Sequence, residues 1–222
     1  MTPTVLDAPT RPTRGNGQIP PRTPNGDDGD HEPSGPHGPL FDNAVLATVF
    51  FIGGETMLFG GLIFGFWILR LAAPVWPPPL QPRLPILVTG INTLVLLGSS
   101  AAVVAASRAL RGRGDRGQLV RRLALAAALG TSFLVIQGYE WARLVRFGLT
   151  VSSGAYGGTF YTLIGAHGLH VFGALIWLGL TALLASQGRL LDGRRGAVRA
   201  CALYWHFVVA LWPILYVTVY LL

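Results

Sequence analysis

The sequence predicts an all-α integral membrane protein, and two features carry that prediction. Charged residues make up only 12% of the 222 residues, and the mean hydropathy is +0.48. Soluble domains carry about twice that share of charge, about 25%. In addition, five stretches are apolar and long enough to cross a bilayer core, which takes about 20 helical residues. An unpaired strand could not satisfy its backbone inside lipid, so the five stretches are expected to be helices.

The chain divides into a tail, 1–40, and a helical region, 41–222. The tail is rich in proline and glycine, and we expect it to be disordered and cytoplasmic because it cannot bury enough apolar surface to offset its ordering entropy. The helices are expected at about 44–70, 85–107, 119–147, 159–186 and 199–222. Proline-rich, arginine-rich and glycine-rich segments separate them, which helices do not tolerate well.

The arginines predict the orientation of these helices. The connections after the second and fourth helices share one side and carry ten arginines, whereas the other side carries four. The excess of basic residues marks the cytoplasmic side. We therefore expect the amino terminus inside and the carboxyl terminus outside. The net charge of +7 is explained by this asymmetry, and no nucleic-acid partner is expected.

The number of cysteines excludes an internal disulfide and a thiolate metal site. Cys201 is the single cysteine of the chain, so it has no internal partner for a disulfide and belongs to no thiolate metal pattern.

Five ionisable side chains fall inside the apolar stretches, where a charge costs about 2.5–3.5 kcal/mol on insertion scales. They are Glu55, Glu140, His167, His170 and His206. We interpret them as polar groups that bond between helices or contact lipid, with no catalytic role. Glu140 lies at a depth similar to that of the two histidines of the fourth helix, so a Glu140–His167 or Glu140–His170 hydrogen bond is one specific hypothesis.

Two other readings stay open at this stage. Two carboxylates and two histidines resemble the ingredients of a self-sufficient di-metal oxidoreductase, but helical di-iron sites use Glu-x-x-His motifs from two helices, and none occurs here. We therefore predict no metal on this chain. The other reading makes Glu55 part of a proton path or the centre of a small-solute carrier, since intramembrane carboxylates often relay protons.

Four further side chains are expected to pack between helices or at an interface with another subunit. Trp205 and Tyr139 lie where aromatic belts form, although Tyr139 could also donate a hydrogen bond. Trp212 is expected to pack inside the helical region, and His206 is expected on the inner side of the last helix.

Five ordered motifs resemble those of subunit III of haem–copper cytochrome c oxidases, in its five-helix bacterial form. They are GGETMLFGG at 53–61, WPPP at 76–79, QGYEW at 137–141, GAYGGTFY with GAHGLHV at 154–171, and YWHFV with Trp212 at 204–212. Their order holds from about residue 43 to the end of the sequence.

The resemblance implies an accessory, non-redox subunit of a proton-pumping oxidase in the respiratory chain of a bacterial inner membrane. It implies a V-shaped bundle whose cleft holds phospholipid, with Glu55 and His170 facing that cleft. Haem and copper would reside on the partner catalytic subunit, subunit I, with subunit II beside it; a respiratory supercomplex is a further possible association. The family role is to stabilise the catalytic subunit and support proton uptake.

One position departs from the family pattern. Val209 stands where the family usually has Asp after the His-Phe-Val stretch. This substitution keeps a second reading open, in which the chain serves a quinol oxidase or a nitric oxide reductase and the electron donor is not cytochrome c.

Overall fold

The computed structural model describes residues 43–79, 81–82, 84–111, 116–188 and 195–222. The expected tail, 1–40, lies outside the described residues. Within them, five helices are long and apolar enough to cross a membrane. Their bounds are α1 Asn43–Ala72, α2 Ile86–Arg111, α3 Arg116–Arg146, α4 Gly154–Ser186 and α5 Arg195–Tyr216, and a π-helix, η1, covers Val217–Leu221. The expected fold class is confirmed at this level: an all-helical chain with five long apolar helices.

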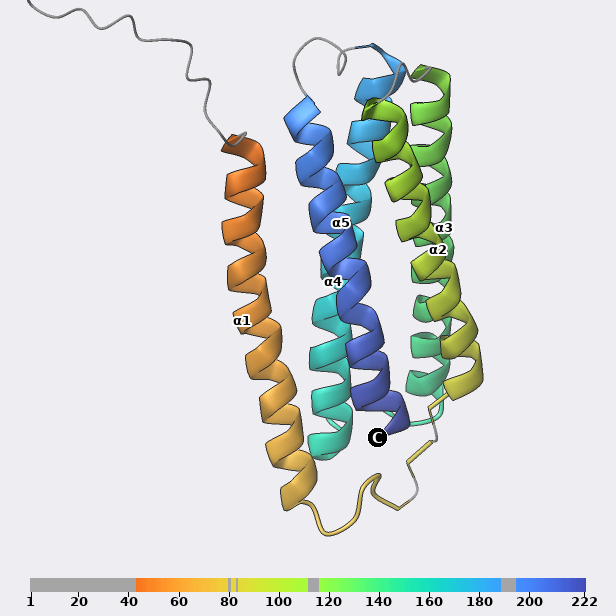
Figure 1. Ribbon diagram of the computed structural model, residues 1–222. Coiled ribbons are helices and arrows are strands. Elements are labelled where there is room, and N and C mark those ends of the chain that lie inside the picture. Colours follow the sequence, from red (N-terminus) through yellow and green to blue (C-terminus); the bar gives the residue numbers. More distant parts are fainter. Residues whose placement is uncertain (1–42, 80, 83, 112–115, 189–194) are drawn as a thin grey trace, which may run out of the picture. The chain divides into compact units, whose positions relative to one another are not determined.

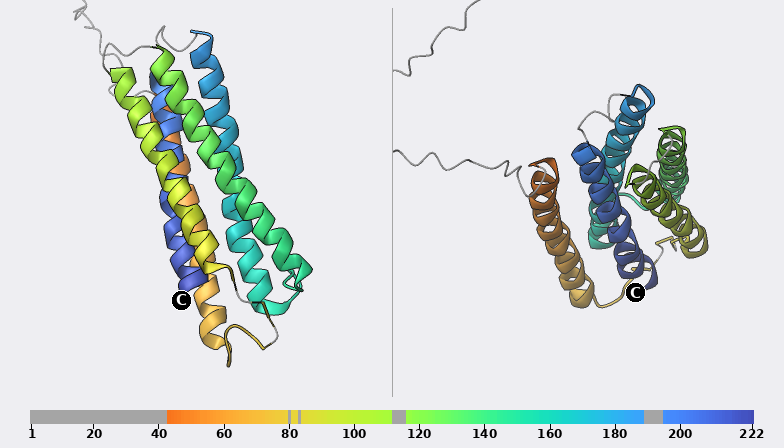
Figure 2. Two further views of the ribbon diagram at one scale, coloured as in Figure 1. Left: turned by 90° about the vertical axis from the view of Figure 1, so that its right-hand side faces the viewer. Right: turned by 45° about the horizontal axis from the view of Figure 1, so that its top comes forward.

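Successive helices run in opposite directions, and four of them form a closed group (Figure 1). In this group α2 packs on α3, α3 on α4, α4 on α5, and α5 on α2. The first helix, α1, lies outside the group and packs on α5 and α4 (Figure 2). Since α1 leaves much of its surface uncovered by the rest of the chain, its attachment depends on few contacts.

The helix α4 begins five residues earlier than the sequence predicts, because side chains close the preceding loop. Ser153 Oγ accepts a hydrogen bond from the Thr150 N–H at 2.9 Å and donates to the Gly148 carbonyl at 3.0 Å. Gly154 then starts the helix with φ of +80°, a conformation that favours glycine. The predicted loop 148–158 is therefore helical over its second half.

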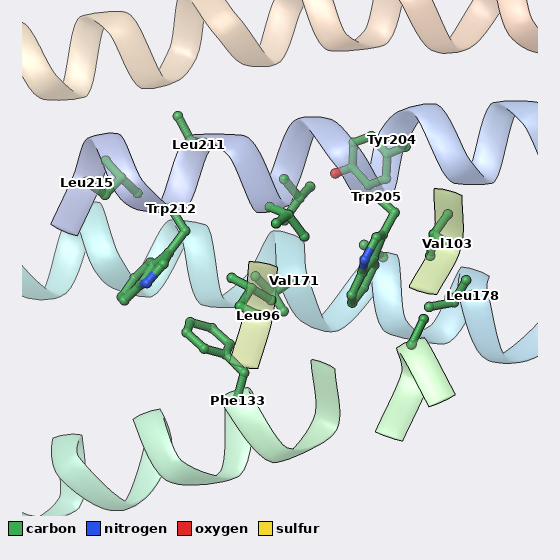
Figure 3. Close-up of a cluster of buried hydrophobic side chains, with 14 of the residues drawn as sticks. Leu96, Val103, Phe133, Val171, Leu178, Tyr204, Trp205, Leu211, Trp212 and Leu215 are labelled. Carbon is green, nitrogen blue, oxygen red and sulfur yellow. The ribbon is translucent and has the colours of Figure 1, made fainter. Parts of the chain in front are cut away.

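Two tryptophans of α5 anchor the core of the four-helix group (Figure 3). They lie seven residues apart and so project from the same face of the helix. Trp205 Nε1 donates to Ser99 Oγ of α2 at 3.2 Å, and Trp212 Nε1 donates to Thr93 Oγ1 of α2 at 2.8 Å. Helices in lipid gain little from apolar burial, so hydrogen bonds and close packing of this kind stabilise the bundle.

Candidate functional site

The candidate site lies between α1 and α4, around the carboxyl of Glu55. Glu55 Oε2 lies 2.6 Å from His170 Nε2, and 11% of the Glu55 side chain and 18% of the His170 side chain are exposed. The contact joins the outlying helix α1 to the four-helix group. A carboxyl near the middle of an apolar helix thus has a partner of matching chemistry.

The second ring nitrogen of His170 determines how many protons the pair holds. His170 Nδ1 lies 2.6 Å from the carbonyl oxygen of Ala166. A carbonyl oxygen only accepts, so Nδ1 carries a hydrogen and donates it. His170 Nε2 and Glu55 Oε2 approach to 2.6 Å, a distance at which two such atoms share one proton. Whether that proton resides on the carboxyl or on the ring, the pair has no net charge, and this suits a low-dielectric position.

His167 has a different environment, although it shares a helix face with His170. It is fully buried, its ring stacks on Trp212 with centroids 5.1 Å apart, and Phe59 contacts it edge-on at 6.3 Å. Neither of its ring nitrogens has a hydrogen-bond partner among the described residues. Phe59 also contacts His170, at 5.2 Å, so one phenyl ring of α1 packs against both imidazoles of α4. His167 therefore acts as an aromatic packing residue.

Glu140 is paired within its own helix. Arg143 Nη1 donates to Glu140 Oε1 at 3.2 Å and to Oε2 at 3.5 Å, and 7% of the Glu140 side chain is exposed against 47% of that of Arg143. The hypothesis of a Glu140–His167 or Glu140–His170 hydrogen bond is therefore wrong. Similar depth in the membrane does not fix the rotation of a helix about its axis, and a partner three residues away lies on the same helix face.

The remaining predicted side chains fall into separate places. Trp205 and Trp212 pack inside the four-helix group, as described above, whereas Tyr139 is exposed, with the Arg143 guanidinium 6.0 Å from its ring centroid. His206 Nδ1 forms a 2.6 Å hydrogen bond with Ser100 Oγ of α2. No group of three or more His, Cys, Asp or Glu side chains comes together within the described part of the chain.

Sequence reasoning missed two residues of the site. Phe59 follows Glu55 by four positions, and Arg143 follows Glu140 by three, so each lies on the same helix face as the carboxyl it accompanies. That spacing was the available signal. In the sequence, Phe59 stands out only as part of the GGETMLFGG motif, and Arg143 only as one of the four arginines on the side opposite the cytoplasm.

Comparisons with known proteins agree with this geometry and extend over most of the chain. The family model described as "Cytochrome c oxidase subunit III" matches residues 31–222. This chain belongs to the cytochrome c oxidase subunit III family. A protein named cytochrome c oxidase subunit 3 from Synechocystis sp. is 36% identical over 192 residues, which cover 86% of this chain and 80% of that protein.

Two further relatives carry the same name. The protein of Bacillus subtilis (strain 168) is 32% identical over 181 residues, covering 81% of this chain and 86% of the relative. The protein of Sus scrofa is 33% identical over 178 residues, covering 78% of this chain and 67% of the relative. The likeness therefore spans bacterial and animal proteins.

Membership in the subunit III family settles the broad function. The chain is a multi-pass membrane protein and a non-redox accessory subunit of the terminal oxidase, which associates with subunits I and II. The family carries no redox metal, so the di-metal reading is set aside. The relatives are named cytochrome c oxidase subunit 3, which favours that complex over a quinol oxidase or a nitric oxide reductase. The departure at Val209 is accommodated by packing, because the side chain is 2% exposed and lies in the apolar core.

Proposed function

We propose that this subunit binds phospholipid where α1 meets the four-helix group, and that it stabilises the catalytic subunit in this way. The observation that carries this proposal is the close Glu55–His170 contact, which remains partly accessible at the junction of α1 and α4. The pair offers hydrogen-bonding atoms without a net charge, which suits the glycerol and ester region of a lipid better than it suits an ion.

Small residues on α1 favour lipid contact beside the pair. No atom of the protein lies within 4 Å of the position that a Cβ on Gly53 or Gly54 would occupy. Both positions leave the surface of α1 open within one helical turn of Glu55, on faces about 100° and 200° around the helix from its side chain. The V-shaped cleft that the resemblance implies stays a prediction, and this space is where we place its lipid.

The test is to count phospholipids in the purified oxidase. Glu55→Leu and His170→Leu each remove one side of the pair, whereas Glu55→Gln preserves a hydrogen-bonding side chain of the same size. We expect the Leu variants to retain fewer phospholipids per haem than the wild type and Glu55→Gln to retain the same number. Equal retention in all four proteins would contradict the proposed lipid site.

Support of proton uptake is the second part of the proposal. The Glu55–His170 contact places two titratable side chains 2.6 Å apart inside the apolar region, and intramembrane carboxylates often belong to proton paths. Glu55→Gln keeps a hydrogen bond and removes the exchangeable proton. If Glu55 supplies protons, oxidase turnover by this variant slows while its lipid content stays unchanged; unchanged turnover restricts the pair to lipid binding and stability.

We also propose a bacterial cytoplasmic membrane location with the amino terminus inside. The described ends of α2, α3 and α5 on that side carry Arg108, Arg116, Arg121, Arg122 and Arg199. The opposite ends carry Arg70, Arg143 and Arg146. A reporter enzyme that is active only outside the cytoplasm, fused after Leu222, is expected to be active, and an inactive but stably produced fusion would reverse the orientation.

A further inference from the structure

A polar hollow lies at the other end of α1 from its amino terminus, where five segments of the chain meet. Its volume is about 330 Å³. Arg70 of α1, Trp76 of the connection, Ile86 of α2, Tyr156 of α4 and Tyr220 of η1 line it. It is distinct from the Glu55 site, because Arg70 follows Glu55 by fifteen helical residues, or roughly 22 Å along the axis.

Arg70 brings to this hollow a positive charge that has no carboxylate partner among the described residues. Its guanidinium lies over the ring of Trp67, 5.5 Å from the centroid. Within the described residues, the ion pairs are those of Glu140 and Glu55, so neither an acidic side chain nor the terminal carboxylate of Leu222 pairs with Arg70. The five N–H donors of the guanidinium therefore remain available for an anion.

Tyr156 supplies a second donor in the same hollow. Its ring is only 6% exposed and packs edge-on against Trp76, with centroids 5.1 Å apart. Other tyrosine hydroxyls at this end are used by the fold: that of Tyr161 donates to the Leu149 carbonyl at 2.9 Å, and that of Tyr216 donates to the Ile86 carbonyl at 3.0 Å. Among the described residues the Tyr156 hydroxyl has no such acceptor, while its ring is held in place.

The position and size of the hollow narrow the class of ligand. It lies where α1 ends at Ala72 and α2 begins at Ile86, which places it at the level of lipid headgroups. A volume of about 330 Å³ is at the lower end for small-molecule pockets, enough for a headgroup and too small for a whole lipid. Leu84 and Ile86 give it an apolar wall against which the first carbons of an acyl chain can pack.

We propose that this hollow binds a phosphate group, with Arg70 pairing with its oxygens and Tyr156 donating a hydrogen bond to it. Guanidinium and phosphate match in charge and in the geometry of two parallel hydrogen bonds. A phospholipid headgroup and free inorganic phosphate share this chemistry. The site is additional to the lipid contact proposed at Glu55, and neither proposal depends on the other.

The test uses the intact, delipidated oxidase and calorimetric titration with three probes: a short-chain phosphatidylglycerol, inorganic phosphate, and a short-chain diacylglycerol that lacks phosphate. Arg70→Gln is compared with Arg146→Gln, a matched control that removes an exposed arginine from the last turn of α3 at the same end of the bundle. We expect Arg70→Gln to raise the Kd for phosphatidylglycerol about tenfold or more. Arg146→Gln is expected to leave that Kd unchanged.

The three probes separate the outcomes. Arg70-dependent binding of phosphatidylglycerol but of neither other probe supports a lipid headgroup, whereas inorganic phosphate binding as tightly supports a soluble source of the same group. Diacylglycerol binding equally to wild type and Arg70→Gln, or no binding of the two phosphate probes, overturns the proposal. If Arg70→Gln does not assemble, Tyr156→Phe removes a single donor from the same site, and an unchanged Kd for both phosphate probes would then overturn it.

Discussion

Glu55 of α1 and His170 of α4 lie 2.6 Å apart through Oε2 and Nε2, and within the described residues this is the ion-pair contact that links two different helices. The helix α1 packs on the outside of the four-helix group, where apolar contact with the protein replaces equally apolar contact with lipid. The polar contact between Glu55 and His170, which apolar lipid tails cannot replace, therefore contributes more to holding α1 than its single contact suggests.

The first prediction concerns the form of this contact. In Glu55→Gln the amide N–H can donate to His170 Nε2, so we expect the stability of the subunit in the oxidase to change by less than about 0.5 kcal/mol. Glu55→Leu leaves the ring nitrogen without a partner and is expected to cost about 1–3 kcal/mol. Thermal unfolding of the assembled oxidase measures both.

The opposite result for Glu55→Gln would show where the proton of the Glu55–His170 pair resides. If Glu55→Gln destabilises as much as Glu55→Leu does, the proton resides on the ring and the contact is an imidazolium–carboxylate pair, since an amide cannot replace the negative charge. A double substitution of Glu55 and His170 by leucine gives the coupling energy between them.

The second prediction separates the two histidines of α4. His167 is buried among aromatic rings with neither nitrogen hydrogen-bonded, so His167→Phe is expected to leave stability unchanged or to raise it by about 1 kcal/mol. His170→Phe breaks the bond to Glu55 and is expected to destabilise by about 1–3 kcal/mol. The melting temperatures of the two variants, compared with the wild type, test this. A larger loss from His167→Phe than from His170→Phe would show that His167 has a polar partner in the assembled oxidase.

The third prediction concerns the ion pair of α3. Arg143 is half-exposed and its partner Glu140 is buried, so Arg143→Gln removes the cation and leaves a carboxylate that is costly to keep in place. We expect a loss of about 1–3 kcal/mol. Arg146→Gln, three residues further along the same helix, is expected to have almost no effect.

A second substitution, at Glu140, shows why Arg143→Gln loses stability. Glu140→Gln removes the charge that Arg143 neutralises, so the double variant Glu140→Gln with Arg143→Gln is expected to be more stable than Arg143→Gln alone. If the second substitution restores nothing, Arg143 acts through packing on Tyr139, and the cation–π contact becomes the better explanation.

Much of the fold follows from the sequence because a single physical requirement fixes it. An apolar stretch of sufficient length must form a helix in lipid, so five helices could be predicted without any information on packing. The start of α4 could not be predicted, because it depends on hydrogen bonds made by Ser153 and on the positive φ of Gly154. The π-helix after Tyr216 had no signal in the apolar pattern either.

The site was predictable in part. The family resemblance predicted its residues better than the depth of each residue in the bilayer did. The resemblance placed Glu55 and His170 at one cleft, and the structure brings these two side chains together. Depth along the bilayer paired Glu140 with the histidines instead, and that hypothesis was wrong because depth gives no information on how each helix is rotated. A contact between helices depends on rotation as well as depth, and rotation is set by packing partners such as Phe59 and Trp212.

The last prediction tests how tightly the Trp205 ring of α5 packs against α3 across the interior of the four-helix group. A Cβ on Gly130 would lie 2.5 Å and 2.9 Å from two atoms of the Trp205 ring and 3.0 Å from Leu175 Cδ2. Trp205 has no room to yield, since its ring is fully buried and its Nε1 is bonded to Ser99. We expect Gly130→Ala to destabilise the subunit by about 1–3 kcal/mol through overpacking.

Gly138 provides the matched control, because it lies eight residues further along the same helix and a Cβ there would meet no atom within 4 Å. Gly138→Ala is expected to be neutral or to stabilise α3 by up to about 1 kcal/mol, since alanine is the better helix former. Thermal unfolding of both variants in the same detergent gives the comparison. Equal stability of the two would mean that the Trp205 ring shifts away from α3 at little cost, and the tryptophan-centred core would then be less rigid than the bond from Trp205 to Ser99 implies.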